Sequence, residues 1–150
     1  MQFSKHVKSE TKGQSLVEFA ISLTVIMILL AGAVEFGIAL FQYVQLRDAA
    51  QEGALYGSLN PDDTTGIEAR VKAASDRPID LQNDGNVTIT PSVIETTNDG
   101  FACEGEGIKV AITYPHQISM PFVSGFIGSN TIPINVSVTD TILISGSGCP

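Results

Sequence analysis

Two carboxylates stand in the most apolar part of the sequence. Glu18 lies at the start of an apolar run, and Glu35 interrupts that run after the uncharged residues Phe19–Val34. An ionised carboxylate is costly to place at or within hydrocarbon, and it is kept there when a partner compensates its charge. The two positions therefore predict charge pairing rather than catalysis.

Each carboxylate also has a simpler interpretation. Glu18 could be an interfacial carboxylate that reaches water and has no role in assembly. Glu35 could lie at the outer boundary between membrane and water, or it could meet a partner helix inside the bilayer. At about 100° per residue along a helix, the two side chains point in clearly different directions.

The sequence has two cysteines, Cys103 and Cys149, with no histidine close to either and no metal-binding spacing. In an oxidising compartment this pair is expected to form one disulfide. The bond would close a long loop and stabilise the folded chain by about 2–4 kcal/mol. The alternative is two free or buried thiols.

The residue types that usually carry catalysis do not converge. His6 and His116 stand alone in the sequence, and no serine-hydrolase elbow, phosphate-binding loop or zinc spacing is found. We therefore predict no catalytic residue, metal site or cofactor, and a protein that is not an enzyme. The formal net charge of −8 argues against nucleic acid as a partner, because phosphates need Lys or Arg to neutralise them.

One long N-terminal helix must position both carboxylates. The apolar stretch Phe19–Val44 exceeds the roughly 20 residues that cross a bilayer. No proline lies between Met1 and Pro61, so a helix from about Ser15 to Tyr56 is expected, roughly 60 Å long. Half of it would lie in lipid, and half would project beyond.

The projecting half carries an apolar stripe of small residues at spacings of three and four, and small side chains let another backbone approach closely. The stripe could pack on the chain's own domain, on a neighbouring subunit, or on both. Its smallest members are Ala49, Ala50, Gly53 and Gly57.

The basic residues before the apolar run predict the orientation. Lys5, Lys8 and Lys12 would keep the N-terminus in the cytoplasm and place the remainder outside. Ala31-Gly32-Ala33 also resembles a signal-peptidase site, which would release a secreted protein. Against this, apolar character continues past the site to Val44.

The remainder, residues 58–150, predicts a small α+β domain. A short amphipathic helix is expected at 67–75, ended by Pro78, and the apolar segment Ile118–Gly128 could cover the sheet or contact a partner. Alternating β-branched segments predict three antiparallel strands that bury one face against the helices. These segments are 87–94, 107–114 and 131–144, and the last could be interrupted near Asp140.

A glycine followed after four residues by glutamate, Gly13 to Glu18, resembles the recognition motif of prepilin peptidase. Together with Gly32–Gly37, and Ala49–Ala54 followed by Tyr56, it resembles the TadE/TadG-like family. These are pilin-like proteins of tight-adherence (Flp) pilus secretion systems.

The resemblance implies a basic leader at 1–13, cleavage between Gly13 and Gln14, and a transmembrane and projecting helix at 14–57. It implies that Glu18 pairs with the freed N-terminal ammonium of a subunit. The expected partners are membrane lipid, prepilin peptidase, other pilin-like subunits and the pilus assembly platform. We therefore predict a single-pass, membrane-anchored minor pilin or pseudopilin with an extracytoplasmic domain. The alternatives are an unprocessed anchored scaffold and a secreted protein.

Overall fold

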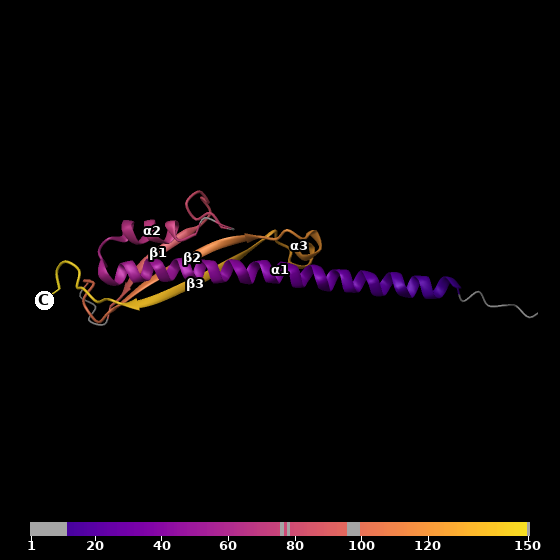
Figure 1. Cartoon of the computed structure of the whole chain (residues 1–150), viewed down its shortest axis with the longest axis horizontal. Helices are drawn as coiled ribbons and strands as arrows, with labels where there is room; N and C mark the ends of the chain where they lie inside the picture. Colours follow the sequence, from indigo (N-terminus) through magenta and orange to yellow (C-terminus); the bar gives the residue numbers. More distant parts are fainter. Residues whose placement is uncertain (1–11, 76, 78, 96–99, 150) are drawn as a thin grey trace, which may run out of the picture.

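The computed structural model describes residues 12–75, 77, 79–95 and 100–149. Its elements are one long helix, two short helices and a three-stranded sheet (Figure 1). The predicted α+β class is confirmed. The basic residues Lys5 and Lys8, the histidine His6 and the predicted helix terminator Pro78 lie outside the described residues.

The long helix α1 runs from Lys12 to Leu59, 48 residues in all, or about 72 Å at 1.5 Å per residue. Its last residue, Leu59, lies about one turn beyond the predicted C-terminal end at Tyr56. Its N-terminal half projects from the domain as a bare rod (Figure 1), and every large hydrophobic side chain from Leu16 to Leu30 is exposed there. A helix that is apolar on all sides is stable in lipid rather than in water.

The sheet is an antiparallel meander in the order β1-β2-β3. Its strands are β1 (Thr88–Ile94), β2 (Gly107–Gln117) and β3 (Thr131–Thr141). The predicted strands are thus present, with β2 three residues longer than expected and β3 ending three residues earlier.

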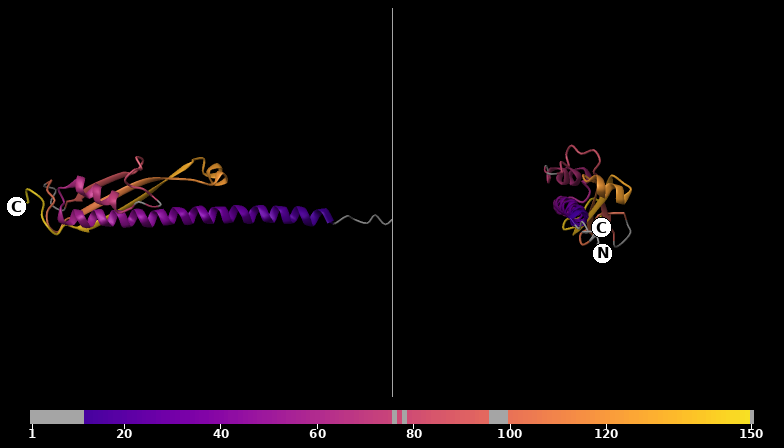
Figure 2. Two further views of the ribbon diagram at one scale, coloured as in Figure 1. Left: turned by 45° about the horizontal axis from the view of Figure 1, so that its top comes forward. Right: turned by 90° about the vertical axis from the view of Figure 1, so that its right-hand side faces the viewer.

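Two helices cover one face of this sheet. Helix α2 (Thr64–Ala73) packs on α1 and β1, and α1 packs on β2 and β3 (Figure 2). The central strand β2 alternates, so that Ile108, Val110 and Ile112 are fully buried against the helices. Ile67 and Val71 of α2 complete the centre of the core.

The apolar segment between β2 and β3 does not cover the sheet. It forms a short helix, α3 (Pro121–Ile127), at the end of the β2–β3 hairpin (Figure 2). The hairpin continues beyond the core, where the Ile118 N–H donates to the Asn130 carbonyl at 2.9 Å. The sequence could not separate these arrangements, because a short apolar run has no period that says what it packs on.

The small residues of α1 lie in the core of the chain's own domain. Ala49 and Ala50 are at most 1% exposed, and Gly53 and Gly57 are buried. A Cβ atom on Gly53 would overlap Val71 Cγ2, and one on Gly57 would lie 2.9 Å from Ile108 Cγ1. The glycines therefore let α1 approach α2 and the sheet at backbone distance.

The far end of the domain is tied together by polar contacts and a disulfide. The Asp63 carboxylate caps α2 by accepting from the Gly66 N–H at 2.8 Å. The Asp62 carboxylate accepts from the backbone N–H and the hydroxyl of Ser147 at 2.5 and 2.7 Å. Cys103 and Cys149 are bonded, which fastens the C-terminal segment to the loop before β2.

These contacts change the acidity of the groups involved. The backbone N–H of Ser147, and then its hydroxyl, hold the pKa of Asp62 below its ordinary value of 3.8. The N–H of Gly66 and the hydroxyl of Tyr56 do the same for the pKa of Asp63. Each carboxylate therefore favours the folded state when it is ionised.

Replacing Gly53 by alanine should destabilise the domain, because the added methyl group overlaps Val71. We expect Gly53→Ala to lower the free energy of unfolding by about 1–3 kcal/mol. The measurement is thermal or denaturant unfolding of the full chain in detergent, followed by circular dichroism. Gly37→Ala is the matched control on the same helix, since its new Cβ meets nothing within 4 Å. Equal losses in both variants would contradict the packing described.

Acid should weaken the contact between Asp62 and Ser147. Because the pKa of Asp62 is lowered in the folded state, its contribution is complete above the ordinary pKa of 3.8 and is lost as the pH falls through the folded value. Asp62→Asn should therefore reduce stability at neutral pH and make the fall in melting temperature on acidification smaller than in the parent chain. A variant with the same acid sensitivity as the parent would show that Asp62 contributes nothing.

Candidate functional site

The buried carboxylate of Glu35 is the centre of the candidate site. Glu35 is 6% exposed, whereas its neighbours Val34 and Phe36 are 53% and 69% exposed. It therefore lies on the one face of α1 that the domain covers, at the place where the bare rod ends and the domain begins.

A histidine from the sheet covers this carboxylate. His116, near the end of β2, is 3% exposed, and its Nε2 lies 3.0 Å from Glu35 Oε1. Its Nδ1 lies 2.5 Å from Oε1 of Gln42. Gln42 follows Glu35 by about two helical turns and so shares its face of α1.

The backbone after β2 adds a second donor. The N–H of Ser119 donates to Glu35 Oε1 at 3.1 Å, so this oxygen has two partners. The other oxygen, Oε2, is buried and has no hydrogen-bond partner among the described residues. We call the contacts among Glu35, Gln42, His116 and Ser119 the clasp, because they close the hairpin end onto α1.

The partners of the imidazole allow two arrangements of its protons when it donates to Glu35. A neutral imidazole has one N–H, yet both ring nitrogens of His116 face an oxygen. With the Gln42 amide in this orientation, the ring donates from both nitrogens and carries a positive charge beside Glu35. With the amide turned over, a neutral ring accepts from Gln42 and still donates Nε2–H to Glu35.

The clasp has a structural effect that its contacts show directly. In the described part of the chain no group of three His, Cys, Asp or Glu could hold a metal ion. What the arrangement does is join residues that are 81 positions apart in the chain. It therefore holds the hairpin end at a set position along α1.

The structure brings together residues that are isolated from one another in the sequence. His116 stands alone in the sequence, yet in the fold it contacts both Glu35 and Gln42. Glu35 has a partner within its own chain, which neither interpretation of that residue included. An acid in an apolar helix signals that some partner exists. No sequence pattern pointed to His116, Gln42 or Ser119 as that partner.

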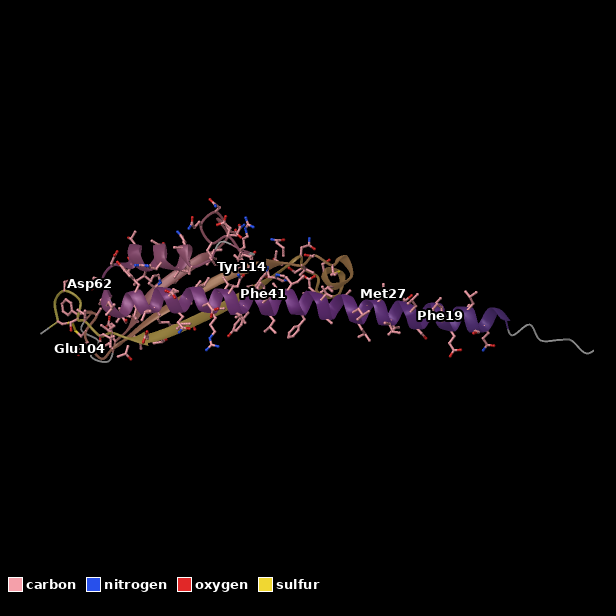
Figure 3. The ribbon with its side chains drawn as sticks, in the orientation of Figure 1. Phe19, Met27, Phe41, Asp62, Glu104 and Tyr114 are labelled. Carbon is pink, nitrogen blue, oxygen red and sulfur yellow. A yellow bond between two sulfur atoms is a disulfide. The ribbon has the colours of Figure 1, made fainter. Side chains whose placement is uncertain are left out.

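The residues of the predicted cleavage motif lie elsewhere. Gly13, Gln14 and Glu18 are all exposed at the N-terminal end of α1. Phe19, which follows Glu18 in the chain, lies far from the domain (Figure 3). A Cβ atom on Gly13 would meet nothing within 4 Å. The structure thus does not bring Glu18 together with Glu35, and the two carboxylates belong to separate sites.

A protein-family model matches the long helix α1. A family model described as TadE-like protein matches residues 13–55, which is nearly all of α1. The resemblance predicted from the sequence is therefore confirmed for this segment. Neither the comparison with curated proteins nor that with solved structures gives a match.

Removing the Glu35 carboxylate should open the clasp. Glu35→Ala leaves the ring of His116 and the N–H of Ser119 without their acceptor, and we expect a loss of about 1–3 kcal/mol in the free energy of unfolding. The measurement is thermal unfolding in detergent, with hydrogen exchange of the hairpin end as a local readout. Faster exchange should be confined to residues 116–131.

Two further variants test whether the loss in Glu35→Ala comes from its contact with His116. Glu18→Ala removes an exposed carboxylate from the same helix and should leave both readouts unchanged. In a double-mutant cycle, His116→Ala should cost less in the Glu35→Ala background than in the parent chain. Additive losses would show that the two side chains do not depend on each other.

Proposed function

We propose that the protein is a membrane-anchored, pilin-like structural subunit of a tight-adherence pilus or related secretion assembly. The observation that carries the proposal is the exposed apolar rod of α1, within the segment that the TadE-like family model matches. The helix from Gly13 to Leu59 is long and apolar enough to cross a membrane. Since that family is a pilus-associated structural family, we propose a structural role and no catalytic activity.

The proposed topology places the N-terminus in the cytoplasm and the α+β domain outside. Lys5, Lys8 and Lys12 precede the apolar rod, which supports this orientation through the positive-inside rule. The disulfide between Cys103 and Cys149 supports it independently. Disulfides persist in oxidising compartments outside the cytoplasm and are rare within it.

Processing and assembly would use the N-terminal end of α1. Cleavage between Gly13 and Gln14 by prepilin peptidase would leave Glu18 in the first turn of the mature helix, where the helix dipole favours a negative charge. Its exposed carboxylate is available to the N-terminal ammonium of another subunit. Pairing would offset two charges that are each expensive to bury.

The partners proposed for this role follow the two halves of α1. The rod would contact lipid before assembly, and other pilin-like subunits and the assembly platform afterwards. The small-residue face is occupied by the chain's own domain. The apolar residues outside it remain for these contacts and include Phe36, Leu40, Phe41 and Val44, which are 46–69% exposed.

The test is the intact mass of protein purified from its native membrane. We expect a mature chain that begins at Gln14, and a longer, unprocessed chain in Gly13→Leu. The larger side chain should block the peptidase without disturbing the fold, because Gly13 has free space around its Cβ position. A chain that begins at Val34 would instead support release by signal peptidase and would remove the proposal.

A second pair of variants separates assembly from anchoring. Glu18→Ala should still be inserted in the membrane but should be depleted from sheared extracellular filaments. Glu52→Ala, which removes an exposed carboxylate from the projecting half of the same helix, is the matched control and should assemble as the parent chain does. Equal assembly of both variants would favour a permanently anchored scaffold.

A further inference from the structure

The end of the domain nearest the rod differs in chemistry from the rest of it. We define the foot as residues 117–132, which comprise α3 and the two ends of the hairpin that flank it. We infer that the foot rests in the headgroup region of the membrane that α1 crosses, in its outer leaflet. The subunit would then contact lipid through its domain as well as through α1. The inference rests on the anchoring proposed above.

The clasp sets the position of the foot along α1. The N–H of Ser119 donates to Glu35, and α3 begins two residues later at Pro121. The foot is accordingly the part of the domain that lies farthest toward the N-terminal end of α1 (Figure 2). Wherever the membrane surface meets Glu35, it also meets the foot.

The length of the rod places Glu35 at that surface. The seventeen steps along the helix from Glu18 to Glu35 rise about 26 Å, close to the roughly 30 Å thickness of the hydrocarbon core. The only charged residue that the sequence holds between Glu18 and Arg47 is Glu35. With Glu18 at the inner boundary, Glu35 and the clasp lie at the outer one.

Charge is absent from the foot and gathers at the opposite end. Between Lys109 and Asp140 the sequence contains no Asp, Glu, Lys or Arg. The acidic residues Asp62 and Glu104 lie at the end of the molecule opposite Phe19 (Figure 3). Charged groups are thus kept from the part of the domain nearest the bilayer, where burying them would be costly.

The foot also leaves apolar side chains uncovered. Ile127 and Ile132 are 50% and 38% exposed, and no residue of the foot whose side chain the structure describes belongs to the hydrophobic core. Such side chains favour the boundary between headgroups and acyl chains. We choose lipid over a second subunit because this surface continues directly from the spanning helix. Since it carries no basic residue, neutral lipid should suffice.

The experiment uses single-tryptophan variants, since the chain has no tryptophan of its own. Ile127→Trp and Ile132→Trp report on the foot, Met27→Trp on the middle of the rod, and Leu143→Trp on the far end of the domain. Leu143 is a matched control, because it is 58% exposed and its N–H bonds to the Ser58 carbonyl near the end of α1. Each full-length variant is reconstituted in phosphatidylcholine vesicles containing lipids brominated at a shallow or a deep position.

Both foot probes should lose fluorescence, most strongly with shallow bromines, whereas the Leu143 probe should not respond. The Met27 probe should be quenched most by deep bromines, which reports the anchor alone. If Met27→Trp is quenched and both foot probes are not, the foot inference is overturned and the anchor stands. If Met27→Trp is not quenched, the proposed function fails. Foot probes that shift to shorter wavelength only as protein density rises, without quenching, would assign the surface to a second subunit.

Discussion

A carboxylate in an apolar setting must have partners, and the arrangement of this protein depends on how Glu35 obtains them. Its Oε1 accepts from the ring of His116 and from the backbone of Ser119, while Gln42 holds the other side of the ring. These contacts lie where α1 leaves the domain and becomes a bare rod. If the hairpin end moved along the helix, the Glu35 carboxylate would become exposed or would stay buried without its partners.

The same helix has to be stable in two different surroundings. Its N-terminal half is apolar on every side, as lipid requires, and its C-terminal half is apolar mainly on the face that meets the sheet. Glycine and alanine on that face allow close approach to Val71 and Ile108, so a single helix forms one wall of a small core. The bare rod and one wall of the core are thus parts of one continuous helix.

The domain is also polarised along this axis. The end near the rod has uncharged, partly exposed apolar residues, whereas the far end has a disulfide, the capping carboxylate of Asp63 and the contact between Asp62 and Ser147. The clasp stabilises the end near the rod, and the disulfide and the aspartate contacts stabilise the far end. A solvated carboxylate is inexpensive at the far end, whereas the buried carboxylate of Glu35 is partnered at Oε1 by His116 and Ser119.

Local pattern was sufficient for the long helix and the three strands. The uncharged run Phe19–Val34 and the absence of proline predicted the spanning helix, and the alternation of Ile108, Val110 and Ile112 predicted the central strand, because each period is a property of neighbouring residues. The resemblance at the N-terminus was likewise readable, since it lies in a contiguous segment.

What the sequence could not determine are the contacts between distant parts of the chain. Glu35 and His116 are 81 residues apart, and neither residue carries a pattern that names the other. Whether Gly53 packs on its own domain or on a neighbour, and whether Ile118–Gly128 covers the sheet or is left exposed, likewise depended on how the elements meet. Sequence periodicity determined which face of each element is apolar, whereas the tertiary structure decided what each face covers, because packing is a relation between elements and not a property of one.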